Sequence, residues 1–446
     1  MHLNKDWVIA VLVLSAALAG CAPPADTGPL SAPAAAASNL SPAYPADTPP
    51  PAAGTEKSLA RALARAMTIE EKCAQILMIA AGTEPSLPKD FAELIKTVPA
   101  GAVLLLGYNI AESPGKIMNL SADFQKTAAA VGKGIPFLIA LDHEGGTVYR
   151  LGGAATRIPG AARAGAFLEK KDAQPESRNA ALFRLYRSSA AQLSLLGFSL
   201  NLAPVLEPLS EANKEFLRHR SYAGDAGTVS RAGGIFIDAM RAGGVLAVGK
   251  HFPGTGGGDP HEKLTYINLD MPQDILPFRD AARVHALGAL MVSHSVAPAL
   301  DPALPVSVSP PALSWIRRHL DFEGIILTDD VNMKALSAQR SPEEAAVMAV
   351  AAGADMIMYL DERGITKVHA ALVGAVREER LPEPRLEEAV TRILEQKLKL
   401  DMWNRSLQLI EDVSASPAFD RRLRQFAALK KEGDALAAAL RHEENP

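Results

Sequence analysis

Hydrophobic residues in this chain fall into short uninterrupted runs, separated by longer segments in which apolar positions recur every three or four residues. Such runs are typical of buried strands, and the recurring pattern is typical of amphipathic helices. The first of these runs, Gln75 to Ile79, is ambiguous, because it fits either a strand or the continuation of the preceding helix. The other strand candidates are 103–106, 136–141, 199–202, 245–248, 290–292, 325–327 and 356–358.

Several helix starts can be predicted from local chemistry. Thr68 and Glu71 have the spacing of a capping box, and Ser113-Pro114 opens a helix that we expect to reach Val131. Ser341-Pro342 is followed by two glutamates that face the positive end of a helix dipole. A long helix is expected from Glu176 to Leu196.

Alternation of short strands with helices predicts an α/β fold with a parallel sheet. With the uncertain first strand included, the candidates suffice to close one TIM-type (β/α)8 barrel, and an open doubly wound sheet is the main alternative. We assign residues 57–400 to this single catalytic domain. Residues 401–446 are expected to form a helical extension whose last part is solvated.

The positions of four polar residues favour the closed barrel over the open sheet. Asp142, Lys250, His294 and Asp329 each follow the carboxyl end of a different predicted strand within a few residues. In a (β/α)8 barrel these strand ends meet on one face, and that face carries the active site. The sequence therefore predicts that these side chains lie close together.

The N-terminus has a separate pattern. A lysine at position 5 precedes the apolar run Trp7 to Ala19, which is too short for a transmembrane helix, and Leu18-Ala19-Gly20-Cys21 resembles the lipobox of bacterial lipoprotein signal peptides. We interpret residues 1–21 as that signal, with Cys21 as the lipidation site; an ordinary cleaved signal peptide is the alternative. Residues 22–56, rich in Ala and Pro, are interpreted as a disordered tether. The predicted location is lipid-anchored to a bacterial membrane, outside the cytoplasm, and on the outer membrane if there are two.

Composition and charge limit the kinds of ligand and partner that the chain is expected to bind. The chain has 446 residues, of which 48% are hydrophobic, so it can bury a large core. A net charge of -4 gives no electrostatic footprint for nucleic acid. Cys21 and Cys73 are the two cysteines, and no His/Cys cluster has metal-ligand spacing, so we expect no disulfide framework, no metal and no cofactor. No obligate protein partner is evident.

The loop from Lys250 to His261 gathers several side chains that could take part in catalysis. It is rich in Gly and Pro and directly follows the strand candidate 245–248. This loop brings a lysine, an aspartate and two histidines to the end of a buried strand. Loops on a rigid scaffold commonly carry catalytic groups, although a plain flexible connection is an equal alternative from composition alone.

Four stretches together resemble glycoside hydrolase family 3, in its single-domain bacterial β-N-acetylglucosaminidase branch. They are Leu141-Asp142-His143-Glu144-Gly145-Gly146-Thr147-Val148-Tyr149-Arg150, Arg220-Ser221-Tyr222, the loop from Lys250 to His261, and Leu327-Thr328-Asp329-Asp330-Val331-Asn332-Met333. The resemblance covers Thr68 to Leu400. It implies a TIM-type barrel and hydrolysis of terminal β-linked N-acetylglucosamine with retention of configuration, from cell-wall or chitin-type oligosaccharides.

The resemblance also implies residue roles. Asp329 takes the place of the nucleophile, which a retaining glycosidase needs beside the anomeric carbon. His261 takes the place of the general acid/base, and Asp259 would orient its ring. The five implied sugar-binding residues are Asp142, Arg150, Arg220, Lys250 and His251. We expect Gly145-Gly146 to let the backbone approach the sugar closely, and His294 to have an architectural role.

The chain departs from the family pattern in the middle of the loop. Thr255 replaces a histidine, Pro260 replaces a serine and the segment is shorter; elsewhere Thr147 replaces an arginine. Two alternatives to hydrolysis therefore remain open. One is a glycoside phosphorylase, in which phosphate replaces water as the acceptor because a histidine acid/base does not repel an anion. The other is a lipoprotein that binds sugar or cell wall without turning it over.

Overall fold

The computed structural model describes residues 55–81, 85–110, 113–131, 133–170, 175–412 and 416–442. The predicted signal peptide, the lipidation site Cys21 and nearly all of the predicted tether lie outside these residues. The tether boundary at residue 56 was placed slightly too late, because helix α2 begins at Thr55 (α2, Thr55–Arg65).

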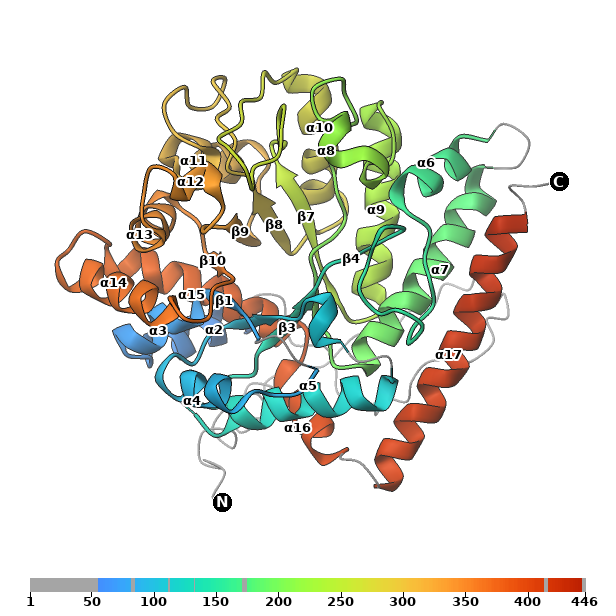
Figure 1. Cartoon of the computed structure of the whole chain (residues 1–446), viewed down its shortest axis with the longest axis horizontal. Helices are drawn as coiled ribbons and strands as arrows, with labels where there is room; N and C mark the ends of the chain where they lie inside the picture. Colours follow the sequence, from blue (N-terminus) through green and yellow to red (C-terminus); the bar gives the residue numbers. More distant parts are fainter. Residues whose placement is uncertain are drawn as a thin grey trace, which may run out of the picture.

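Eight parallel strands close into a barrel in the order β1-β10-β9-β8-β7-β6-β3-β2 (Figure 1). This arrangement confirms the predicted (β/α)8 fold and excludes the open sheet. Every strand candidate is part of the barrel, including the uncertain first one, which pairs with β10 and β2. The strands are β1 (Leu77–Ala80), β2 (Ala102–Leu104), β3 (Leu138–Leu141), β6 (Leu200–Asn201), β7 (Leu246–Phe252), β8 (Ala289–Val292), β9 (Ile325–Asp330) and β10 (Met356–Tyr359).

Helices surround the strands, and the predicted starts are accurate. Thr68 forms both hydrogen bonds of a capping box with Glu71 at the start of α3 (Ile69–Gln75). The Ser341 side chain caps α13 (Pro342–Ala352). The other helices around the barrel are α4 (Lys89–Thr97), α5 (Pro114–Ala129), α6 (Ala161–Glu169), α7 (Pro175–Leu195), α9 (Ala226–Ala242), α10 (Met271–Arg283), α11 (Pro310–His319), α14 (Ile365–Arg377) and α15 (Glu383–Lys399).

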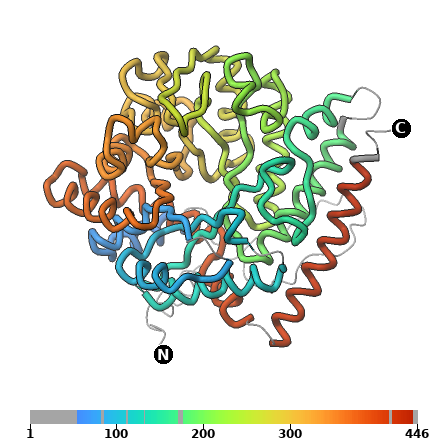
Figure 2. The backbone as a smooth tube through the Cα atoms, in the orientation of Figure 1, coloured from blue at the N-terminus to red at the C-terminus, as the bar shows by residue number. Residues whose placement is uncertain are grey.

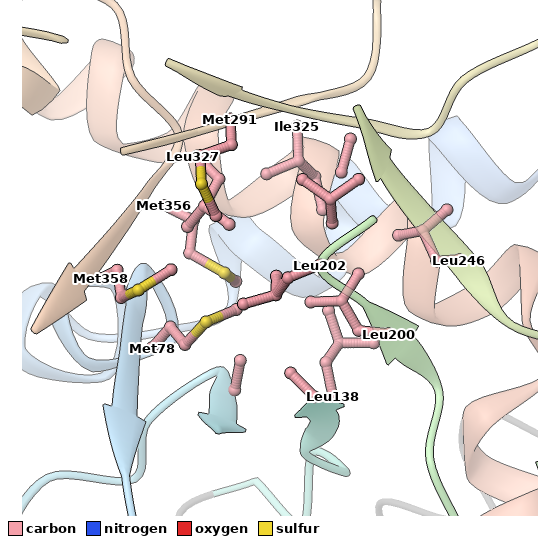
Figure 3. Close-up of a cluster of buried hydrophobic side chains, with 14 of the residues drawn as sticks. Met78, Leu138, Leu200, Leu202, Leu246, Met291, Ile325, Leu327, Met356 and Met358 are labelled. Atoms are coloured by element: carbon pink, nitrogen blue, oxygen red, sulfur yellow. The ribbon is translucent and has the colours of Figure 1, made fainter. Parts of the chain in front are cut away.

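The barrel interior is a packed apolar core. Figure 3 shows methionines from β1, β8 and β10 meeting leucines from β3, β6 and β9 between the strands. Met78, Met356 and Met358 are each no more than 3% exposed. Such close packing is what a barrel of this size requires, because its interior is filled by side chains and leaves no channel.

The C-terminal extension is helical, as predicted, but its last part is not simply solvated. Helix α17 (Pro417–His442) runs along the outside of α7, beyond α16 (Met402–Glu411) (Figure 2). It buries Phe419, Phe426 and Gly433 on one face, and a Cβ at Gly433 would lie 2.5 Å from Thr156 Oγ1. Within the described ranges, no helix is both long and apolar enough to span a bilayer.

Candidate active site

Strand periodicity places three charged residues at the carboxyl end of the barrel interior. Side chains two residues apart in a strand point to the same face. On β9, Ile325 and Leu327 point into the barrel, and Asp329 is next in that series. By the same counting, Asp142 follows inward-pointing Leu138 on β3, and Lys250 follows inward-pointing Leu246 on β7.

Lys250 and Arg220 join two carboxylates into a buried network. The Lys250 ammonium donates to Asp142 Oδ1 at 2.7 Å and lies 2.8 Å from Glu144 Oε1. Arg220 donates to both oxygens of Glu144, at 2.9 and 2.8 Å. Burial alone would raise the pKa of Glu144, but Lys250 and Arg220 bring it down to about 2. Burial likewise opposes the charge of Lys250, yet Asp142 and Glu144 raise the pKa of the amine above its usual value.

Asp329 lies at the end of β9 as an ionised carboxylate. Burial works against its ionisation, but the neighbouring His251 and His294 rings, a hydrogen bond from the Asp330 N–H and the Lys250 ammonium hold its pKa below the usual value. A carboxylate in this state is available as a nucleophile or as an electrostatic partner for a developing cation.

Asp330 and His294 support this strand end. Burial, together with the charge of Asp329, raises the pKa of Asp330 to about 6, and its Oδ1 accepts backbone N–H bonds from Asn332 and Leu360. The His294 Nε2–H donates to the Asp330 carbonyl at 3.0 Å, and its Nδ1 accepts from Ser307 Oγ at 2.8 Å. Because burial lowers the pKa of His294, its neutral form fits both contacts.

Glu207 holds the His251 ring through a hydrogen bond to Nδ1. The Nδ1–H of His251 donates to Glu207 Oε1 at 2.6 Å. The other carboxylate oxygen accepts from the backbone N–H of Thr255 at 2.7 Å and from its hydroxyl at 2.9 Å. Thr255 is therefore a buried anchor for the loop.

The end of the loop carries a histidine–aspartate pair. His261 Nδ1 lies 2.7 Å from Asp259 Oδ1, and the His261 backbone N–H donates to the same oxygen at 2.8 Å. The two side chains are 65% and 40% exposed, so the ring is open to solvent and substrate. Burial slightly opposes ionisation of Asp259, but its bonds to His261 hold the pKa of Asp259 below the usual value. The Pro260 carbonyl accepts from the Ala335 N–H, which fastens this loop to the segment after β9.

Arg150 is not part of the charged network. It follows the β4–β5 hairpin (β4, His143–Gly145; β5, Val148–Tyr149), and its Nε is buried without a partner among the described residues. Its Cδ lies near Gly107 in the turn after β2, which places it at the edge of the same barrel face. The structure thus brings together Asp142, Arg220, Lys250, His251 and Asp329, and leaves Arg150 to one side.

Gly145 and Gly146 pack closely against the loop at Pro159 and Gly160, a contact that the sequence did not predict. A Cβ at Gly145 would lie 2.2 Å from the Pro159 carbonyl oxygen, and a Cβ at Gly146 would lie 2.7 Å from Gly160 Cα. Both residues have positive φ. Their small size therefore serves the packing of one loop against another, and the contact that requires it is internal.

Sequence reasoning missed Glu144 and Glu207, the two carboxylates that hold the cationic residues in place. Both follow strands that were predicted, so their position after a strand was the available signal. Their spacing along the chain resembles no standard pair, because the contacts form between different strands. The hairpin β4–β5 was also missed.

In the part of the chain that the structure describes, no group of three His, Cys, Asp or Glu side chains is arranged to hold a metal ion. A groove of about 2420 Å³ lies at the opposite, amino end of the barrel, bordered by α7, α16 and α17. The charged groups are at the other end, and catalytic groups in barrels lie at the carboxyl ends of strands.

The geometry defines a barrel enzyme with an ionised strand-end carboxylate, a histidine–aspartate pair on a neighbouring loop, and a charged network suited to sugar hydroxyls. Comparison with known families agrees with this class of enzyme. Residues 68–396 match the glycosyl hydrolase family 3 N terminal domain, and the chain belongs to this glycoside hydrolase family.

Individual relatives are similar over most of the chain. The chain is 27% identical over 370 residues to beta-hexosaminidase A of Pseudoalteromonas piscicida, covering 77% of this chain and 60% of that protein's length. It is 30% identical over 329 residues to the beta-hexosaminidase of Idiomarina loihiensis, covering 72% of this chain and 92% of that one. Among solved structures, the family 3 beta-N-acetylglucosaminidase from a Paenibacillus species has a TM-score of 0.70 and 27% identity, covering 82% of this chain and 69% of that one.

Proposed function

We propose that the protein is a retaining β-N-acetylglucosaminidase that removes terminal β-linked N-acetylglucosamine from cell-wall or chitin-type oligosaccharides. The observation that carries the proposal is the ionised Asp329 at the inner end of β9, with the His261–Asp259 pair on a loop fastened to the segment after that strand. The names of the two beta-hexosaminidases and of the Paenibacillus enzyme support the sugar class.

In the first step, Asp329 attacks the anomeric carbon and the bond to the leaving oxygen breaks. The Asp259 carboxylate accepts the Nδ1–H of His261, so the Nε2–H of the protonated ring is the proton donor to the leaving oxygen. The product of this step is a glycosyl ester on Asp329. In the second step, Nε2 takes a proton from water, the hydroxyl attacks the anomeric carbon, and Asp329 leaves as a carboxylate.

The charged network is suited to binding the sugar. Asp142 is partly exposed and held by Lys250, so its orientation is fixed while it remains accessible. Arg220 is similarly fixed by its two bonds to Glu144. Side chains that are positioned before substrate arrives bind hydroxyl groups with less loss of side-chain entropy.

The test uses an aryl N-acetyl-β-glucosaminide with the purified protein. We expect release of the aryl group with retained anomeric configuration by NMR, and at least about a thousandfold loss in Asp329→Asn, because the covalent step is removed. A 2-deoxy-2-fluoro glycoside should label Asp329, as mass spectrometry of the digested protein would show. Undiminished activity of the variant, or a label on another residue, contradicts the proposal.

Phosphate is the second arm of the same experiment. Parallel reactions with and without inorganic phosphate distinguish the two acceptors. Free N-acetylglucosamine in both reactions supports the hydrolase, whereas sugar 1-phosphate in the reaction with phosphate identifies the phosphorylase.

We also propose that the chain is anchored by lipid at Cys21, outside the cytoplasm. The support is the sequence Leu18-Ala19-Gly20-Cys21 and the composition of the following segment. Expression in a bacterium with radiolabelled palmitate should label the wild type and not Cys21→Ser. A labelled Cys21→Ser protein, or an unlabelled wild type, rules out this attachment.

A further inference from the structure

Tyr266 is an exposed aromatic residue on the long loop that follows β7. Its side chain is 61% exposed, and in the part of the chain that the structure describes the other exposed aromatic side chain is Tyr108, at 53%. A single exposed apolar side chain is common on protein surfaces and needs no function. The significance of Tyr266 therefore depends on how firmly it is held and on what lies beside it.

The backbone at Tyr266 is fixed against the segment after β8, where Tyr266 pairs with Val296 in a parallel β-bridge. The Ile267 N–H donates to the Val296 carbonyl at 2.9 Å, and the Val296 N–H donates to the Thr265 carbonyl at the same distance. The Thr265 side chain is buried, and its hydroxyl lies 2.7 Å from Ser295 Oγ. The residues on either side of Tyr266 thus hold its backbone in place.

The ring of Tyr266 points away from the body of the protein. Side chains alternate along an extended segment, and here Thr265 is buried and Ile267 packs against the core, so Tyr266 faces the opposite way. On the inner side, a Cβ at Gly254 would lie 2.4 Å from Ile267 Cδ1, and a Cβ at Gly256 would lie 2.5 Å from the Tyr266 carbonyl oxygen. The loop therefore packs closely beneath a ring that remains exposed.

Tyr266 lies on the same side of the barrel as the proposed general acid. His261 precedes it on the same loop, and the Ala335 N–H donates to the Pro260 carbonyl, which fastens His261 beside the segment after β9. Tyr266 is fastened to the segment after β8, and β8 and β9 are paired. Tyr108, in contrast, is on η2 (Gly107–Asn109) after β2, which is opposite β8 in the closed barrel.

The general acid defines where the second sugar must lie. The acid stands within hydrogen-bond reach of the leaving oxygen, so the group attached to that oxygen lies next to the acid. In an oligosaccharide this group is the second sugar. A pyranose ring carries C–H groups whose slight positive charge matches the negative face of an aromatic ring. A tyrosine has two side-chain torsions, so it loses little entropy when a ligand orders it.

We propose that Tyr266 forms a subsite for the second sugar of the substrate, the one that departs with the leaving oxygen, by stacking its ring on the C–H face of that sugar. The charged network binds the terminal N-acetylglucosamine, and Tyr266 selects oligosaccharides over glycosides with a small leaving group. The inference rests on the proposed function, because it takes His261 as the acid and Asp329 as the nucleophile.

The test measures sugar binding by calorimetry in the Asp329→Asn protein, with the chitin-type disaccharide of N-acetylglucosamine and with free N-acetylglucosamine. Adding Tyr266→Ala should weaken binding of the disaccharide about tenfold, because the apolar contact with one ring face is lost. Binding of the free sugar should not change. Tyr266→Phe keeps the ring and should bind both sugars as before. Tyr108→Ala removes a similarly exposed tyrosine from the opposite side of the barrel and should change neither affinity.

Three results would overturn the subsite: unchanged disaccharide binding in Tyr266→Ala, an equal loss for both sugars, or the same loss in Tyr266→Phe. The last would identify a hydrogen bond from the hydroxyl in place of stacking. Chromatography of the mixtures tests the proposed function separately. If Asp329→Asn cleaves the disaccharide at the wild-type rate, the nucleophile is wrong, whatever the effect of Tyr266. If neither sugar binds to any variant, the proposed function fails and the subsite fails with it.

Discussion

Arg220 donates two parallel hydrogen bonds, of 2.9 and 2.8 Å, to the Glu144 carboxylate, and the Lys250 ammonium forms an ion pair with the same carboxylate. Glu144→Gln would leave two cations with one carboxylate, Asp142, between them. Breaking a buried ion pair of this kind costs on the order of 3–5 kcal/mol. We expect that loss in the free energy of unfolding at pH 7, measured by urea denaturation, with Glu211→Gln in an exposed pair as the unaffected control.

The difference between Glu144→Gln and the wild type should depend on pH. The pKa of Glu144 is about 2 in the folded protein and 4.5 in its usual state, so its ionisation stabilises the fold fully above pH 4.5. This contribution is lost as pH falls toward 2. The variant and the wild type should therefore converge in stability between these values, and a constant difference would contradict the assignment.

Replacement of His261 should separate substrates by their leaving groups. Loss of a general acid typically costs about 10²–10⁴ in rate. His261→Ala should lose this much on an N-acetylglucosamine disaccharide and much less on a nitrophenyl glycoside, whose leaving group needs no proton. Asp259→Asn, which leaves the ring without its carboxylate partner, should show a smaller loss in the same direction. Equal losses on both substrates would contradict an acid role.

Gly145 and Gly152 test the packing role of the glycine after Glu144. Both have positive φ, so alanine is strained at each, but a Cβ at Gly145 meets the Pro159 carbonyl at 2.2 Å, whereas a Cβ at Gly152 meets nothing within 4 Å. Gly152→Ala should cost about 1–2 kcal/mol, because alanine is strained in the left-handed region. Gly145→Ala should lower the melting temperature several degrees further, and equal melting temperatures would contradict the contact.

Lys397 predicts a rise of stability with pH, as Glu144 does, but in an alkaline window. It is fully buried on α15, donates to Gln75 Oε1 at 2.9 Å, and burial lowers its pKa to about 7. Between pH 7 and 10.5 the unfolded chain binds the proton and the folded protein does not, so stability rises with pH across this window. Lys397→Met should flatten that rise, measured by urea denaturation. Lys399→Met, at an exposed position two residues along, is the matched control and should keep the slope.

The fold could be predicted from sequence because its signals are local. Each strand is a short apolar run, and starts such as Thr68 and Ser341 place polar side chains where backbone N–H groups need partners. The burial of α17 could not be predicted in this way. Its contacts depend on Gly433 passing close to Thr156, a residue distant in sequence, and the helix composition is that of a solvated surface.

The site was partly predictable for a similar reason. Asp142 directly follows β3, and Lys250 and Asp329 lie near the ends of β7 and β9. The inward phase of these strands can be counted from sequence, so the convergence of the three side chains follows from barrel closure. Glu207 could not be identified, because its partners His251 and Thr255 lie at the end of another strand and on the loop after it. The position of Thr255 could not be predicted for the same reason, because it is set by the hydrogen bonds of Thr255 to Glu207. Electrostatic partners across a barrel become visible only once the strands are ordered in space.

The bond from the Ala335 N–H to the Pro260 carbonyl couples two loops that come from different strands. If the loop after β7 swings outward to admit an oligosaccharide, this bond must break or the segment after β9 must move with it. Coupled movement would preserve the spacing between His261 and Asp329 while the entrance widens. The proline-containing loop would then trade breadth of entry for constancy of alignment, which would suit the proposed removal of terminal sugars.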